Sequence, residues 1–121
     1  MLYYLNNCQS LKHAKIYGSG AIYDLWAKGF EDKIAGEMAP GDKCLVASRQ
    51  DNDKISFSSY LFTRARKVPN PTGEKPEIWV LEGTFEKEIV IPRSEAVNRA
   101  PYSRFFNKRG HFNQWSVVRG V

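Results

Sequence analysis

The feature that most restricts the fold is a period-two alternation in "KISFSSYLFTRARKV", residues 54–68. Side chains at every second position of a β-strand share one face, so this pattern predicts a strand. One face of this strand would carry Ile55, Phe57, Ser59 and Leu61, and the other face would carry Ser56, Ser58, Tyr60 and Phe62. After the proline- and glycine-rich turn or loop "PNPTGEKP", residues 77–92 predict one long strand, or two short strands kinked at Gly83, ending at Pro92.

Shorter segments supply the remaining predicted elements. Residues 1–5 and 43–48 are apolar, β-prone runs, and residues 112–118 predict a last strand. Residues 6–20 predict a loop with a helical turn, and residues 30–38 predict a helix that ends at Pro40-Gly41. Two further short helices are expected, over residues 93–100 with Ser94 as N-cap and after Pro101.

These elements predict an α+β fold with five to six strands and two to three short helices. A sheet with so many short connections curls or closes to protect its edges, so we expect a small curved or partly open β-barrel. The length of 121 residues is that of one domain, and we expect a single domain over residues 1–121.

The composition indicates the cellular compartment of the chain and whether it binds a metal or a cofactor. No apolar run is long enough to span a bilayer, and the start "MLYYLNNCQS" lacks the pattern of a secretion signal, which predicts a cytoplasmic chain without a membrane partner. Cys8 and Cys44 form neither a metal quartet nor a disulfide framework, and Cys44 suits a small buried thiol. We expect no metal and no cofactor.

The net charge of +5 is concentrated near the C-terminus. Residues 1–90 hold twelve basic and twelve acidic side chains, whereas residues 91–121 hold six basic side chains against Glu95 alone. Clustered cations gain affinity for nucleic acid by releasing its condensed counterions, so this segment is a candidate phosphate-binding surface. A solvated basic end that aids solubility is the alternative. The six basic residues are Arg93, Arg99, Arg104, Lys108, Arg109 and Arg119.

The aromatic content, with three tryptophans, six tyrosines and seven phenylalanines, exceeds what so small a core requires. Aromatic rings beside polar or small residues provide surfaces on which planar bases stack. Tyr23 and Trp26 are singled out because they lie in a Gly-flanked segment of mixed polarity. Trp79 is singled out because it alternates with Ile78 and Val80 and so faces the opposite side of its predicted strand, although a tryptophan in a strand is commonly a core residue. Trp115, within the expected last strand, is assigned to the core.

The sequence offers little for catalysis. His13 and His111 are far apart and have no metal-ligand spacing. Glu31-Asp32-Lys33, with Asp24 seven residues before it, faintly resembles the carboxylate and lysine set of a metal-dependent nuclease. Such a site needs acids that converge from adjoining strands, whereas residues 31–33 fall on the start of a predicted helix. We therefore expect a binding protein rather than an enzyme, with a small nuclease or nuclease subunit as the alternative.

The order of several segments resembles the PUA-like superfamily, especially its EVE and YTH-like branch, across most of the chain. The segments are "YDLWAKGF", a short helix, "MAPGDKCLVAS", "KISFSSYLFTRARKV", "WVLEGTFEKEIVI" and "YSRFFNKRGHFN". The resemblance implies a curved barrel whose aromatic pocket accepts one modified base turned out of a nucleic-acid strand. Members bind N6-methyladenosine in RNA, or methylated or hydroxymethylated bases in DNA, and some are specificity domains of modification-dependent restriction enzymes.

By this resemblance, Trp26 matches the pocket aromatic before the first helix, Ser48 matches the strand end beside the pocket, and Trp79 supplies a second wall; Tyr23 is added from its spacing. The chain lacks a clear third cage aromatic and the ASCH motif, so the identity of the base is not carried over. DNA is favoured over RNA by analogy, and a nuclease or motor domain is a possible partner. The predicted phosphate-binding residues are Arg64, Arg66, Lys67, Arg93, Arg104, Lys108 and Arg109.

A third hypothesis is a protein-interaction domain of a toxin–antitoxin or phage-related system, with its aromatic side chains facing a protein partner. The nuclease alternative predicts Mg²⁺-dependent cleavage that Glu31→Ala abolishes, and the binding module predicts no cleavage and a loss of binding in Trp26→Ala. The protein-interaction hypothesis predicts weak nucleic-acid binding that does not depend on Trp26.

Overall fold

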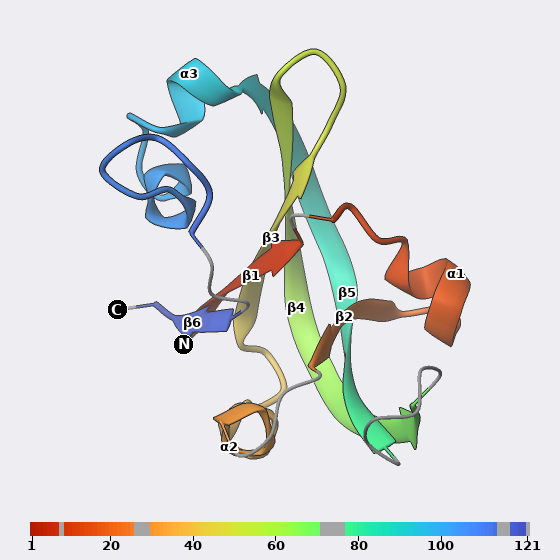
Figure 1. The fold of residues 1–121 in the computed structure, drawn as a ribbon. Helices are drawn as coiled ribbons and strands as arrows, with labels where there is room; N and C mark the ends of the chain where they lie inside the picture. Colours follow the sequence, from red (N-terminus) through yellow and green to blue (C-terminus); the bar gives the residue numbers. More distant parts are fainter. Residues whose placement is uncertain (8, 26–29, 71–76, 114–116, 121) are drawn as a thin grey trace. The chain divides into compact units, whose positions relative to one another are not determined.

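The chain is described from a computed structural model, which describes residues 1–7, 9–25, 30–70, 77–113 and 117–120. Figure 1 shows the strands and the short helices along the chain. The helices are α1 (His13–Tyr17), α2 (Phe30–Glu37) and α3 (Arg93–Ala96), followed by the 3-10 helix η1 (Tyr102–Phe105). The strands are β1 (Leu2–Asn7), β2 (Ala21–Leu25), β3 (Lys43–Arg49), β4 (Lys54–Pro69), β5 (Glu77–Pro92) and β6 (Val117–Arg119).

Six strands form one sheet in the order β2-β5-β4-β3-β1-β6. β1 pairs parallel with β3, so that Tyr3 lies opposite Cys44, and antiparallel with β6. The order runs from β2 to β6 without returning to its start, as expected of a partly open arrangement. The predicted α+β class is thereby confirmed.

The long alternating segments behave as predicted. β4 covers residues 54–69, and β5 is one continuous strand over residues 77–92 rather than two strands separated at Gly83. Ile55 and Phe57 are buried on β4, and Ile78, Val80 and Leu81 are buried on β5. Cys44 is buried on β3, as the apolar run around it indicated.

One segment had no predicted structure, and one prediction was wrong. Residues 21–25 form β2, because pairing with β5 satisfies the backbone of this short segment. The helix expected over residues 93–100 ends at Ala96, and Ser94 is not its cap: Pro92 occupies the N-cap position without a side-chain hydrogen bond. The helical turn expected after Pro101 is η1.

Two compact units divide the chain, and the long strands β4 and β5 contribute to both. Unit 1 consists of Met1–Leu11, Lys43–Tyr60 and Phe85–Val121, and unit 2 consists of Lys12–Asp42 and Leu61–Thr84. Each unit is described by itself below.

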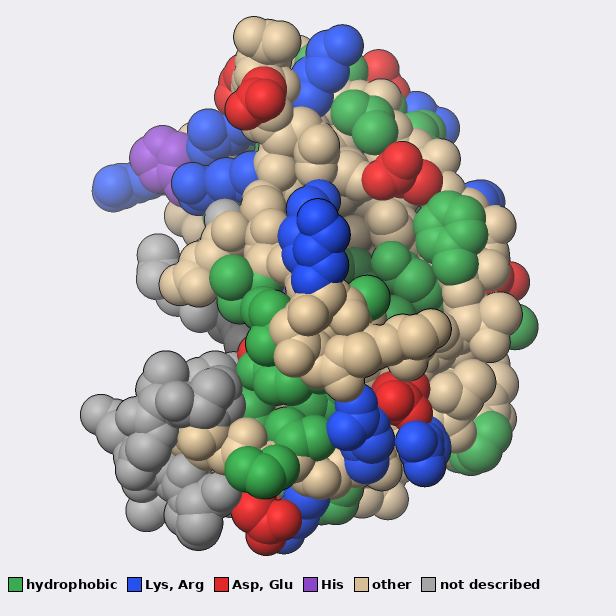
Figure 2. All heavy atoms as spheres, turned by 90° about the vertical axis from the view of Figure 1, so that its right-hand side faces the viewer, with side chains coloured by type: hydrophobic (Ala, Val, Ile, Leu, Met, Phe, Trp, Pro, Cys, Tyr) green, Lys and Arg blue, Asp and Glu red, His purple; other side chains and the backbone are tan. Residues whose placement is uncertain are grey.

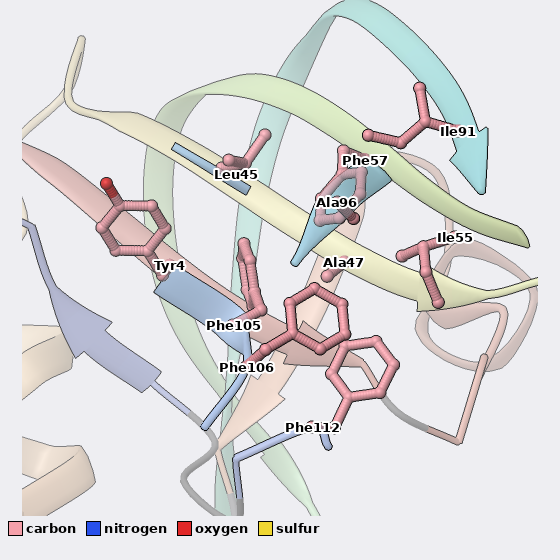
Figure 3. Close-up of a cluster of buried hydrophobic side chains, with 10 residues drawn as sticks. All are labelled: Tyr4, Leu45, Ala47, Ile55, Phe57, Ile91, Ala96, Phe105, Phe106 and Phe112. Carbon is pink, nitrogen blue, oxygen red and sulfur yellow. The ribbon is translucent and has the colours of Figure 1, made fainter. Parts of the chain in front are cut away.

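Unit 1 has an aromatic core (Figure 3). The Phe105 ring lies edge-on to Tyr4 at 5.5 Å between centroids and also contacts Phe57, at 5.7 Å. Phe106 and Phe112 stack at 4.8 Å, in a loop that a β-bridge between these two residues closes. Phe105 thus anchors η1, within the basic C-terminal segment, to the sheet.

In unit 2, the Pro40-Gly41-Asp42 turn joins α2 to the strands. Gly41 has φ of +93°, a backbone conformation that glycine adopts without strain. The Gly41 N–H donates to the Phe62 carbonyl at 2.9 Å, and the Ala39 N–H donates to the Asp42 carboxylate at 2.9 Å. Ile34 and Met38 are buried, as the predicted apolar face of this helix requires.

Candidate nucleic-acid interface

Trp79 is the predicted pocket aromatic whose surroundings are best defined. It is half-buried on β5, between the buried Ile78 and Val80. Its indole N–H donates to Asp32 Oδ1 of α2 at 2.6 Å, and Lys67 Nζ of β4 lies 5.1 Å from the centroid of its rings. The indole is thus held from its edge by a carboxylate and contacted on a face by a cation, while part of it stays accessible to solvent.

Tyr23 has a different environment from the one predicted. Its side chain is only 5% exposed, it lies opposite Leu81 in the β2–β5 pair, and its ring centroid is 5.4 Å from that of His13. A ring enclosed in this way has no open face on which a base stacks. Tyr23 therefore packs from β2 against His13 of α1, which corrects its prediction as a pocket wall.

The other two predicted pocket residues are Trp26 and Ser48. Trp26 lies outside the described residues, and so does Trp115, which was assigned to the core. Ser48 belongs to unit 1, whereas Tyr23 and Trp79 belong to unit 2. Ser48 is half-buried at the end of β3, and its hydroxyl accepts a hydrogen bond from Asn7 Nδ2 at 3.0 Å.

Two predicted phosphate ligands on β4 are bound to an internal carboxylate. Arg64 Nε and Arg66 Nε both donate to Glu82 on the neighbouring strand β5, the latter at 2.8 Å, and Arg66 Nη2 also donates to the Tyr17 carbonyl. Hydrogen bonds from Arg64 and Arg66 lower the pKa of Glu82, so this carboxylate stays ionised and offsets their charge. The Arg66 side chain is thus largely engaged within the fold, whereas the Arg64 side chain remains 68% exposed. Lys67 is exposed beside Trp79.

The predicted phosphate ligands of the C-terminal segment form a more open group. Arg104 is exposed on η1, and Lys108 and Arg109 are exposed in the loop between Phe106 and Phe112. The Asn107 carboxamide oxygen accepts hydrogen bonds from the Arg109 and His111 N–H groups, which fixes this loop. Figure 2 shows blue basic side chains beside a histidine at the edge of the face in view.

The positive charge is divided unequally between the two units. Unit 1 contains ten Lys and Arg against five Asp and Glu, whereas unit 2 contains eight of each. The whole net charge of +5 thus belongs to unit 1. Among the basic residues of unit 1 that were not predicted as phosphate ligands are Arg49 and Lys54. They lie at the two ends of the polar loop "RQDNDK", and this position is the signal that the sequence offered.

The residues of the nuclease alternative have other roles where they are described. Asp24 is buried, with His13 Nε2 3.1 Å from its Oδ1 and the Tyr17 hydroxyl donating to its Oδ2 at 2.7 Å. Lys33 is exposed on α2. Across the part of the chain that the structure describes, no three His, Cys, Asp or Glu side chains are grouped as metal ligands.

No family model and no curated protein matches the sequence, so the resemblance to the PUA-like superfamily stays a prediction. In the described ranges, none of the helices has the length and apolar character needed to cross a bilayer.

Proposed function

We propose that this protein is a nucleic-acid-binding module that takes one base, turned out of its strand and modified by methylation or hydroxymethylation, against an aromatic surface. The observation that supports it most is the partition of charge: the whole excess of +5 lies in unit 1, with Arg104, Lys108 and Arg109 exposed there. Such a surface attracts polyanions of any sequence.

Trp79 is the described residue best suited to contact the base. Its indole is partly accessible, and its N–H is already satisfied by Asp32, so a stacking partner gains contact without breaking that bond. Extrusion of a base costs a few kcal/mol, which phosphate contacts and stacking together must exceed. Trp26 is proposed as the second indole on the strength of the sequence resemblance alone.

DNA is the proposed nucleic acid, by analogy with restriction specificity domains, and the cytoplasm is the proposed compartment. In this proposal the module performs no chemistry itself; a nuclease or motor domain or subunit acts on the strand that it recognises.

The test is a titration with oligonucleotides that differ only at one cytosine, which is plain, methylated or hydroxymethylated, as single and double strands. Tryptophan fluorescence reports the indole environment, and two salt concentrations separate phosphate from base contributions. We expect tighter binding of a modified strand, quenching on binding, and a steep loss of affinity at higher salt. Affinity that is weak at low salt and unaltered by modification or by Trp79→Ala would instead favour the protein-interaction hypothesis.

A further inference from the structure

A hollow of about 280 Å³ opens on unit 1 beside the loop between β3 and β4. Its lining combines three basic side chains with one carboxylate and a phenyl ring, and the sequence patterns did not single it out. The lining residues are Arg49, Gln50, Asp53, Lys54, Ile55, Arg93 and Phe112.

Backbone hydrogen bonds bring the basic residues to this place from separate parts of the chain. The Gln50 N–H donates to the Lys54 carbonyl at 2.8 Å and closes the β3–β4 loop, with Asn52 and Asp53 at φ of 61° and 58°. The Arg93 N–H donates to the Asp53 carbonyl at 3.0 Å. These two bonds fix the start of α3 against the loop, so Arg93 faces the same hollow as Lys54.

Arg49 is held over the aromatic floor of the hollow. Its guanidinium carbon lies 5.0 Å from the centroid of Phe112, and the Ser10 hydroxyl donates to the Arg49 carbonyl at 2.7 Å. Phe112 is only 6% exposed and is stacked on Phe106, as Figure 3 shows. The ring therefore serves as a support for the guanidinium rather than as an open stacking face for a base.

Arg93 is also held in position. Its Nε and Nη2 donate to the Gly110 carbonyl at 3.0 and 2.6 Å, which uses two of the five N–H donors of a guanidinium. Arg49, fixed over Phe112, and Arg93, fixed on Gly110, lose little further conformational freedom when they bind an anion, which favours affinity.

We propose that this hollow binds a phosphate group, through Arg49, Lys54 and Arg93. The inference deepens the proposed nucleic-acid binding and rests on it for the source of the phosphate. Three cations against Asp53 leave a positive site, and guanidinium groups match phosphate oxygens with paired N–H donors. The phosphate is either a strand end or an internal phosphodiester, and both present the same oxygens.

The decisive variant removes two exposed cations that line the hollow. Arg49→Ala/Lys54→Ala is compared with Lys43→Ala/Lys87→Ala, which removes the same charge from exposed positions of unit 1 outside the hollow. We expect the first pair to weaken oligonucleotide binding at least about tenfold more than the control, since each charged hydrogen bond contributes about that factor. Equal weakening by the two variants would overturn the proposal.

Oligonucleotides with a 5′-phosphate or a 5′-hydroxyl show whether the bound phosphate is a strand end or an internal phosphodiester. A preference for the phosphorylated end that the Arg49/Lys54 variant loses indicates a terminal phosphate, whereas equal binding of both ends, with loss in that variant, indicates an internal one. Asp53→Asn adds a test with the opposite sign: removal of its carboxylate should tighten phosphate binding, and weaker binding contradicts the proposal.

A titration with inorganic phosphate tests the phosphate site independently of the proposed nucleic-acid binding. The wild-type protein is used, and chloride keeps the ionic strength constant. We expect saturable NMR shifts at the backbone amides of Gln50, Lys54 and Arg93. If phosphate binds there while oligonucleotides do not bind at all, the proposed function fails and the phosphate site stands. If oligonucleotides bind while no saturable shift occurs, the phosphate site fails and the function stands.

Discussion

Trp79 and Asp32 are joined by a hydrogen bond of 2.6 Å between the indole N–H and a carboxylate oxygen, although 47 positions separate them in the sequence. The bond connects β5 to α2 within unit 2 and fixes the edge of an indole that remains partly accessible. The orientation of Trp79 is therefore set before any ligand binds.

Replacement of Trp79 should reveal whether this indole stacks on a base. We expect Trp79→Ala to weaken binding of a modified oligonucleotide by about 1–3 kcal/mol, the usual contribution of one stacked base, and Trp79→Phe to retain most of the affinity. Fluorescence anisotropy of a labelled strand measures both. Equal affinity of the alanine variant and the wild type would remove Trp79 from the interface.

The exposed loop cations should control the salt dependence. We expect Lys108→Ala/Arg109→Ala to reduce the slope of log K against log salt by about one to two, because each lost phosphate contact removes roughly one unit of slope. Plain and modified strands should weaken alike, since these side chains contact phosphates rather than bases. Lys43→Ala/Lys87→Ala is the matched control, and an unchanged slope in the loop variant would refute the assignment.

The buried group around Asp24 should be important for stability. His13→Ala leaves the Asp24 carboxylate without one polar neighbour in a buried site and also removes a ring packed against Tyr23, so we expect a loss of about 1–3 kcal/mol in the free energy of unfolding. Tyr17→Phe removes a single hydrogen bond to the same carboxylate and should cost only about 0.5–1.5 kcal/mol. Urea denaturation measures both, and a His13→Ala variant as stable as the wild type would contradict the packing described.

Glu82 should make stability depend on pH in a defined direction. Hydrogen bonds from Arg64 and Arg66 hold its folded-state pKa below the ordinary value of 4.5, so the ionised carboxylate contributes stability above that pH. The contribution should be lost as the pH falls from about 4.5 through the lower folded-state pKa. Glu82→Gln should therefore be less stable than the wild type at pH 7, and the difference should shrink at acid pH in denaturation curves recorded between pH 7 and pH 3. A difference that is constant across this range would show that the ion pairs do not stabilise the fold.

The sequence by itself determined the long strands, because their alternation is a local property that needs no knowledge of partners. The period over residues 54–68 predicted β4, and Pro92 correctly predicted the end of β5. The apolar spacing of Ile34 and Met38 likewise predicted which side of α2 is buried. The net charge and its position near the C-terminus also follow from the residues alone.

Only the tertiary structure decided which side chains meet. Glu82 bonds to both Arg64 and Arg66 and offsets one of their two charges because β5 lies beside β4. β2 is a strand because β5 supplies its hydrogen-bonding partner. Tyr23 and Trp79 were both predicted to line the pocket, yet Tyr23 is enclosed beside His13 and Trp79 remains partly accessible. The physical reason is that burial and ion pairing arise from contacts between residues far apart in the chain, which local periodicity does not encode.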